Sequence, residues 1–175
     1  MIIELSSVCN SIIETNEKII CDQFLISLTD TISTSLNLFH QAPNKNGIYF
    51  LYWNDILVYI GKSSGIKGST ICGRLKSAYN KINSRQNISI NEMKWKCVII
   101  ENKNQKWIDT IEQILITYFD PEWNRIGGFG YRGGKDDYHN KNDKKEYRRK
   151  WDLMFPPKNL KINRLFEACG QSVQS

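Results

Sequence analysis

The chain has 175 residues, of which 41% are hydrophobic and 11% aromatic, and its formal net charge is +6. These values fit a globular protein rather than a disordered chain, and the length allows one domain with a proper core. No apolar run approaches the ~18 residues of a membrane-spanning helix, and the N-terminus has no basic region typical of a signal peptide, so neither a membrane span nor export is expected.

The N-terminal segment, residues 1–46, is acidic. It carries five acidic and two basic side chains, a net charge of −3, which leaves +9 on residues 47–175. Its apolar residues have helix-like spacing, which predicts one or two helices in the first 40 residues. A loop is predicted to end this segment because turn-forming residues cluster there: Pro43, Asn44, Asn46 and Gly47.

Two short runs of aromatic and β-branched residues follow, at positions 48–53 and 56–60. They predict a β-hairpin whose turn contains Asn54 and Asp55. Both turn residues tolerate the positive φ that tight hairpin loops require.

Two helices and a third strand are predicted after the hairpin. Residues 69–82 form the first helix, with Ser69 or Thr70 as its N-cap and a buried stripe made of Ile71, Leu75, Ala78 and Ile82. Residues 93–101 form the strand, with one face made of Trp95, Cys97 and Ile99. Residues 105–119 form the second helix, which ends before Pro121.

The C-terminal part combines glycine with basic residues. Residues 126–134 contain five glycines and are expected to be irregular. Residues 141–151 predict a basic helical stretch. The whole chain is expected to form a single domain, residues 1–175.

The cysteines and histidines offer little for disulfide or metal chemistry. The five cysteines show no C-x-x-C spacing, and their odd number excludes complete pairing. They predict reduced thiols in a cytoplasmic protein. His40 and His139 are too few and too far apart for a zinc site.

Five sequence elements stand in a fixed order along the chain. They are Gly47-Ile48-Tyr49, then Tyr59-Ile60-Gly61 with Lys62, then Arg74, then Glu112 with Leu115 and Ile116 in the pattern E-x-x-L-I, and finally Pro121 with Asn124 in the pattern P-x-x-N. In this order and spacing, residues 47–124 resemble the GIY-YIG nucleases, a family that cuts DNA with a single divalent metal ion.

The resemblance implies an α+β fold in which a small three-stranded antiparallel sheet is flanked by helices. Residues 47–124 would form the catalytic core. Residues 1–46 would be a helical N-terminal extension, and residues 125–175 a glycine-rich and basic C-terminal extension.

The resemblance makes Glu112 the metal ligand. Glu112 lies one turn from both Ile108 and Ile116, so its carboxylate projects from the apolar side of the predicted helix. One Mg²⁺ ion per active site suits a single carboxylate completed by waters and substrate oxygens. Arg74 would place its guanidinium on the scissile phosphate. Without the motif, Glu112 would be interpreted as a salt-bridged glutamate and Arg74 as a surface residue.

The resemblance also assigns roles to the two tyrosines. Tyr49 would lie next to the attacking water as the general base, with Tyr59 in support. A phenol has a pKa near ~10, so positive charge from Lys62, Arg74 and the metal is needed to favour the phenolate. Lys62 has direct phosphate binding as an alternative role. Asn124 would orient neighbouring groups through its amide, or cap the following backbone.

A shared site requires Tyr49 and Tyr59 on one face of the sheet. A plain two-residue turn would place Tyr49 opposite Ile60, and Tyr59 would then point to the other face. We therefore predict a three-residue loop or a bulge that shifts the strand pairing by one residue.

One position departs from the family pattern. Many members carry a histidine or tyrosine four residues after the helix arginine, where this chain has Ala78. Tyr79 follows one residue later, and a one-residue offset turns a helical side chain by ~100°. The sequence leaves open whether Tyr79 joins the site.

The basic residues indicate a polyanionic partner. Residues 56–91 contain no Asp or Glu but six Lys or Arg. Loops 63–68 and 83–91 and the C-terminal basic segment are candidate contacts to double-stranded DNA, through Lys67, Lys76, Arg85, Arg132, Lys135, Lys145, Arg148 and Arg149. The alternative for the C-terminal run is a charged, exposed helix.

Among GIY-YIG nucleases, this compact chain is most similar to the type II restriction endonucleases, some of which share a segment like Gly128-Phe129-Gly130. Cutting both strands of a symmetric site with one active site per chain favours a homodimer. A cognate DNA methyltransferase is then implied. Two alternatives remain: a small repair or mobile-element nuclease with structure-specific or non-specific cutting, and a non-catalytic DNA-binding module.

Overall fold

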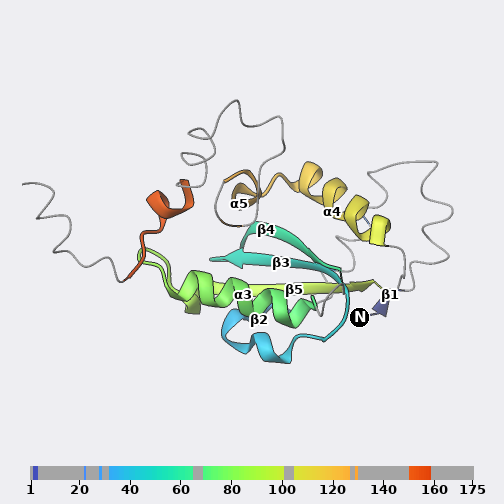
Figure 1. The fold of residues 1–175 in the computed structure, drawn as a ribbon, viewed down its shortest axis with the longest axis horizontal. Coiled ribbons are helices and arrows are strands. Elements are labelled where there is room, and N and C mark those ends of the chain that lie inside the picture. Colours follow the sequence, from blue (N-terminus) through green and yellow to red (C-terminus); the bar gives the residue numbers. More distant parts are fainter. Residues whose placement is uncertain are drawn as a thin grey trace, which may run out of the picture.

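A small, mostly antiparallel sheet lies between the helices (Figure 1). The structure is a computed structural model, and it describes residues 2–3, 22, 28, 32–64, 69–100, 105–126, 129 and 150–158. The three long strands are β3 (Gly47–Trp53), β4 (Ile56–Ser63) and β5 (Met93–Ile100). β3 pairs antiparallel with both of the others, which leaves β4 at an edge of the sheet. The predicted α+β class and antiparallel core are confirmed.

Two short strands enlarge this sheet beyond the three predicted strands. β1 (Ile2–Ile3) pairs parallel with β5, and β2 (Thr34–Ser35) pairs antiparallel with it, so the described residues form a sheet of five strands. Each has only two residues, and such a short segment carries no periodic pattern in the sequence.

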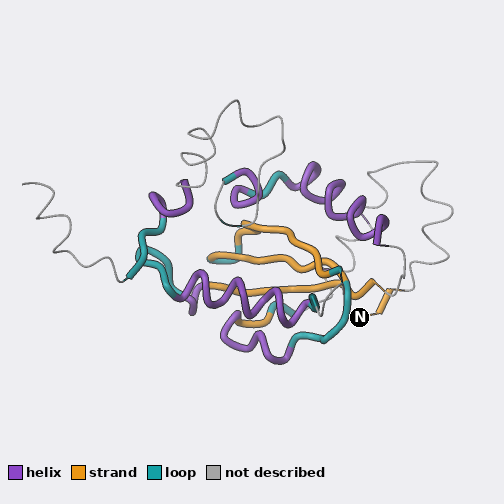
Figure 2. Tube along the Cα trace, in the orientation of Figure 1, coloured by secondary structure: helices purple, strands orange, loops and turns teal. Residues whose placement is uncertain are grey.

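Helices cover both faces of the sheet (Figures 1 and 2). α3 (Ile71–Asn83) lies on one face, together with the 3-10 helix η1 (Leu36–Gln41). α4 (Gln105–Phe119) packs on the other face through Ile108, Ile111 and Leu115. The sheet therefore separates two apolar layers, one on the α3 side and one on the α4 side.

Local hydrogen bonds explain where α3 begins and where α4 ends. The Thr70 side chain caps α3 by accepting a hydrogen bond from the Gly73 amide at 3.2 Å. α4 ends at Phe119, and the next residue, Asp120, has a φ of 44° and donates its amide to the Ile116 carbonyl at 2.9 Å. The predicted stripe on α3 and the stop before Pro121 are both confirmed.

The hairpin combines a two-residue turn with a bulge. Asn54 and Asp55 have φ values of 49° and 64°, as a tight hairpin turn requires. The pairing then shifts between Leu51 and Tyr52, so that Val58 is an extra residue on β4. The predicted shift by one residue is confirmed.

The bulge brings the two tyrosines to one face. Val58 lies in the α3-side layer, and Tyr49 and Tyr59 are on this side too. Ile48 and Ile60, their neighbours along the strands, belong to the α4-side layer. Without the extra residue, the alternation of side chains would have separated the tyrosines.

The N-terminal prediction of one or two helices falls mostly outside the described residues. Within them, Asp22 and Leu28 are helical, whereas residues 34–41 form β2 and η1 instead of an α-helix. Leu28 is 5% exposed and packs into the α4-side layer. Its carbonyl accepts a hydrogen bond from Lys96 Nζ at 2.7 Å. This part of the N-terminal segment supports the core.

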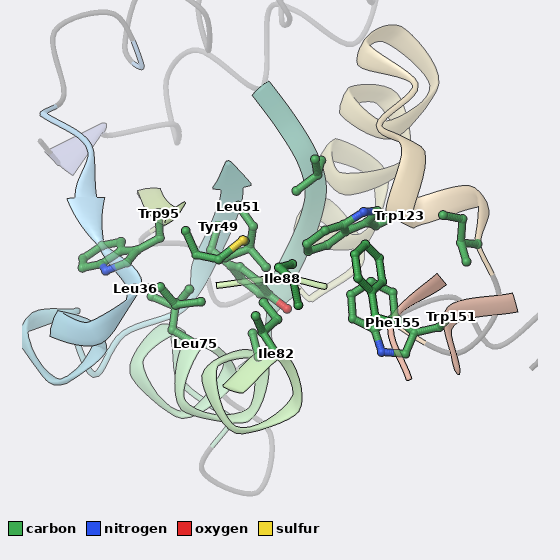
Figure 3. Close-up of a cluster of buried hydrophobic side chains, with 14 of the residues drawn as sticks. Leu36, Tyr49, Leu51, Leu75, Ile82, Ile88, Trp95, Trp123, Trp151 and Phe155 are labelled. Carbon is green, nitrogen blue, oxygen red and sulfur yellow. The ribbon is translucent and has the colours of Figure 1, made fainter. Parts of the chain in front are cut away.

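The segment 150–158 docks against the C-terminal end of α3. Trp151 and Phe155 are almost fully buried in the α3-side layer, and Figure 3 shows them grouped with Trp123. Arg85 binds this segment through Asp152 at 2.6 Å and the Phe155 carbonyl at 3.2 Å. The predicted basic helix 141–151 lies outside the described residues except for its last two positions, which are helical.

Two further observations concern the described part of the chain. None of its helices is long and apolar enough to cross a membrane. Cys72 and Cys97 are free thiols, and the other three cysteines lie outside the described residues.

Candidate active site

Two tyrosines from the hairpin form the centre of the candidate site. The Tyr49 and Tyr59 rings lie with their centroids 5.9 Å apart and their planes inclined by 43°. Figure 3 shows Tyr49 within the side-chain cluster between the sheet and α3. Tyr49 is only 6% exposed, so its hydroxyl is held in a largely water-free environment.

Gly61 is required by the close approach of these rings. A Cβ at Gly61 would lie 2.5 Å from the Tyr49 hydroxyl and 2.7 Å from Cε1 of Tyr59. Glycine is required at position 47 for a separate reason, because a Cβ there would lie 2.0 Å from the Val98 carbonyl oxygen on β5. The outer glycine of each sequence motif therefore has a steric explanation.

The surroundings of the tyrosines keep both phenols protonated. Burial raises the pKa of Tyr49 well above its ordinary value, and the proximity of Tyr59 raises it further. Burial likewise raises the pKa of Tyr59 to about 12, with a contribution from the charge of Glu112. Arg74 lowers both pKa values, but burial outweighs it. Deprotonation of either tyrosine requires more positive charge than the chain itself supplies.

Glu112 is a buried carboxylate in an ion pair. It is 9% exposed on α4, and its Oε2 lies 2.7 Å from Lys62 Nζ. Burial raises the pKa of Glu112, while the ion pair with Lys62 opposes this shift. For Lys62, burial lowers the pKa, but hydrogen bonds to its carboxylate partners prevail and raise it.

Lys62 contacts a second carboxylate that the sequence analysis missed. Asp109 Oδ1 lies 3.2 Å from Lys62 Nζ. Asp109 is three residues before Glu112, so both side chains project from the same side of α4. The expectation of only one acidic residue near the site therefore has to be corrected.

Arg74 is an exposed residue whose charge acts on the tyrosine pair. It is exposed on the first turns of α3, where its Nε donates to Ser69 Oγ at 2.9 Å. Its charge lowers the pKa values of both tyrosines, whereas the charge of Glu112 raises them. A guanidinium and a carboxylate therefore act on the same two hydroxyls.

Asn124 binds the backbone of the edge strand β4. Its Oδ1 accepts the Ile60 amide at 2.8 Å, and its Nδ2 donates to the Ile60 carbonyl at 2.8 Å. These two bonds satisfy an edge position that no neighbouring strand pairs. Because Ile60 lies between Tyr59 and Gly61, Asn124 holds the part of β4 that carries the site.

Tyr79 packs outside the tyrosine pair. Its ring contacts Phe39 of η1, with the centroids 5.1 Å apart. Ala78 is 6% exposed and occupies the preceding core position on α3. The ~100° rotation expected from the one-residue offset explains this placement.

An aromatic wall supports Tyr59 from the C-terminal part of the chain. We define it as Trp123, Phe129, Trp151 and Phe155. The Phe129 ring packs edge-on against Tyr59 with a centroid distance of 4.9 Å. The Phe129 carbonyl accepts a hydrogen bond from Lys81, whose ammonium also lies 4.8 Å from the Phe129 ring centroid. Burial lowers the pKa of Lys81 to about 8.

The predicted DNA-contacting residues divide into three groups. Lys76 is exposed on α3, two residues after Arg74. Arg85 is paired with Asp152, and its side chain is 14% exposed, so it holds the C-terminal segment in place. The remainder lie outside the described residues: Lys67, Arg132, Lys135, Lys145, Arg148 and Arg149.

The donor set suits a hard cation. Glu112 offers a carboxylate whose ion pair with Lys62 has to open before a cation can bind, and its charge raises the pKa values of both tyrosines. Within the described residues, no group of three or more His, Cys, Asp or Glu side chains could hold a metal ion. Such a site would rely on water and substrate oxygens, which is the coordination that Mg²⁺ prefers.

A comparison with protein families identifies the chain. The family model described as the Eco29kI GIY-YIG domain matches residues 59–168, more than half of the sequence. The chain belongs to this family. It is an enzyme of the GIY-YIG class, a DNA endonuclease. The matched range includes the segment 150–158, which supports Tyr59 through the aromatic wall.

Solved structures with similarity include the GIY-YIG N-terminal endonuclease domain of UvrC from Thermotoga maritima, bound to magnesium as its catalytic divalent cation. It is 19% identical, and the match covers 53% of this chain and 99% of that domain with a TM-score of 0.38. A tyrosine-to-phenylalanine point mutant of the same domain is 22% identical and has a TM-score of 0.34, over 50% of this chain and 91% of that one. No curated protein sequence matches the chain.

Proposed function

We propose that this endonuclease is a type II restriction enzyme that hydrolyses phosphodiester bonds at a specific duplex sequence, with one Mg²⁺ ion per active site. The observation that carries the proposal is that the charges of Arg74 and Glu112 act on the hydroxyls of Tyr49 and Tyr59, whose ring centroids lie 5.9 Å apart. Membership of the Eco29kI family supports the restriction activity in particular.

The proposed chemistry starts with the phosphate. Arg74, exposed on α3, binds the scissile phosphate and offsets the charge that grows in the transition state. Glu112 holds the divalent ion, which when bound adds positive charge beside the phosphate oxygens. Lys62, one third exposed, lies close enough to Glu112 to contact an incoming phosphate as well.

The tyrosines handle the proton of the attacking water. Tyr49 is the proposed general base, and Tyr59 supports it from the neighbouring strand, with the two ring centroids 5.9 Å apart. Burial raises the pKa values of both tyrosines. The Tyr49 phenolate therefore forms only after the bound substrate and ion add positive charge to the site. In this scheme Asn124 is a positioning residue, because its amide binds only the β4 backbone in the described contacts.

The proposed substrate and assembly follow from the number of sites. Each chain offers one site and a duplex has two strands, so we propose that a homodimer acts on double-stranded DNA. Lys76 lies on the same helix as Arg74 and is a proposed phosphate contact. A restriction enzyme also requires protection of the host genome, which implies a cognate DNA methyltransferase specific for the same sequence.

One experiment tests this function. A long duplex of known sequence is incubated with the protein and Mg²⁺, with Glu112→Ala as the inactive control and Lys94→Met as a surface control. Discrete, reproducible fragments support restriction. A smear, or cutting confined to branched substrates, would instead support the repair or mobile-element nuclease. DNA that stays intact under all conditions would contradict both the restriction enzyme and the repair or mobile-element nuclease. The third alternative, a DNA-binding module without activity, already conflicts with membership of an endonuclease family.

A further inference from the structure

Lys62 is held between two carboxylates of unequal burial. Its Nζ lies 2.7 Å from Glu112 Oε2 and 3.2 Å from Asp109 Oδ1. The Glu112 side chain is 12% exposed, whereas that of Asp109 is 49% exposed. The ammonium therefore has an inner partner that belongs to the proposed metal site and an outer partner on the solvent side of the same helix.

This arrangement conflicts with cation binding at Glu112. A divalent ion that approaches the carboxylate meets the positive charge of Lys62 at close range, and like charges in a partly buried site repel strongly. Lys62 also follows Gly61 on a strand fixed by Asn124, so its backbone has little freedom to retreat. The ammonium has to move by changes in its own side chain.

Asp109 offers a destination for that movement. It already contacts the ammonium and lies farther out, so the ammonium can leave Glu112 and keep a carboxylate partner. We propose that Asp109 is a positioning residue that takes over the Lys62 ammonium when Glu112 binds a divalent cation. The inference rests on the metal role of Glu112 in the proposed function.

A double-mutant cycle of metal binding tests the proposal without DNA. Full-length wild type, Lys62→Met, Asp109→Asn and the double variant are titrated with Mn²⁺ and Mg²⁺ by calorimetry at about pH 8, where carboxylates are ionised. We expect Lys62→Met to tighten binding about tenfold, because the competing ammonium is gone. Asp109→Asn should weaken binding about fivefold in the wild-type background and less than about twofold in the Lys62→Met background.

The cycle separates this mechanism from simpler ones. If Asp109 acts directly on the cation, Asp109→Asn weakens binding by the same factor in both backgrounds, and the proposal is overturned. It also falls if Lys62→Met does not tighten binding. Asp109→Glu keeps an acidic partner and should stay within about twofold of wild type. Lys62→Gln replaces Lys62→Met if the latter does not fold.

Matched controls come from another ion pair. Lys94 and Asp55 form a pair of 2.7 Å at the hairpin turn, so Lys94→Met and Asp55→Asn should leave metal affinity unchanged. Glu112→Gln shows whether a negative result refutes the metal site itself or only the role of Asp109. If it binds Mn²⁺ as tightly as wild type, the metal site itself is wrong and this proposal falls with it. If it abolishes binding while the cycle shows no coupling, only the role of Asp109 is overturned.

Discussion

Replacement of Gly61 by alanine is the sharpest test of the tyrosine arrangement. The added Cβ would lie 2.5 Å from the Tyr49 hydroxyl, and ordinary contact begins at 3.4 Å, so the ring or the strand has to move by about 0.9 Å. Tyr59 has to adjust as well, since its Cε1 would lie 2.7 Å away. Neither ring can move freely, because both pack in the α3-side layer.

Two magnitudes follow from this displacement. Overpacking of a filled core costs about 1–3 kcal/mol of unfolding free energy. Misplacement of a reacting group by about 1 Å costs on the order of 10²-fold in rate. Gly61→Ala is therefore expected to lose about 10²-fold in the single-turnover cleavage rate while remaining folded at room temperature.

The assay combines single-turnover cleavage of a duplex with urea unfolding. Val98→Ala is the matched control, because it removes a buried side chain on β5 and costs roughly 2 kcal/mol without touching either tyrosine. We expect Val98→Ala to cleave at nearly the wild-type rate. A folded Gly61→Ala variant with wild-type activity would refute the claim that the tyrosine positions determine catalysis.

Three further predictions concern stability. Asn124→Ala removes both hydrogen bonds to Ile60 and should lower the unfolding free energy by about 1–3 kcal/mol in urea titrations. The control is Asn80→Ala, because Asn80 is exposed. If both variants lose the same unfolding free energy, the role assigned to Asn124 is contradicted. The folded-state pKa of Tyr59 is about 12, above its unfolded value. The contribution of Tyr59 to the unfolding free energy is therefore complete below about pH 10 and is lost between about pH 10 and 12. Tyr59→Phe should make the unfolding free energy less dependent on pH in this window, by up to about 1.4 kcal/mol per pH unit, and an unchanged slope would disprove the shift. Trp151→Ala should cost about 3–5 kcal/mol in thermal unfolding, and a loss below about 1 kcal/mol would show that the aromatic wall is not part of the core.

The local elements of the core could be predicted from the sequence because their signals are local. Apolar periodicity and a capping threonine fix α3, and Pro121 follows the end of α4. The bulge was predictable for a different reason, since a shared site for Tyr49 and Tyr59 is incompatible with simple alternation across a two-residue turn.

The partners of individual polar residues could not be predicted in the same way. Asp109 and Glu112 share a side of α4, but nothing in the sequence indicates that Lys62 points between them. Arg85 shows the same limit, because a basic residue in a polar loop is equally consistent with a DNA contact and with its pairing to Asp152. Such contacts join residues far apart in the chain and carry no periodic signal.

Long-range apolar contacts could not be predicted from the sequence either. Trp151 and Phe155 lie at the end of a charged segment that the sequence leaves open between a DNA contact and an exposed helix, yet both are buried against Trp123. The core therefore extends beyond the residues that carry the catalytic motif, through contacts that link positions 59, 129 and 151.

The central claim is that Glu112 is the carboxylate on which cleavage depends. The most direct measurement is the single-turnover cleavage rate of Glu112→Gln against wild type, on duplex DNA at saturating protein with Mg²⁺. The substitution preserves the size of a side chain that is 9% exposed. We predict a loss of at least about 10³-fold with DNA binding retained. A Glu112→Gln rate within about tenfold of wild type would contradict the account.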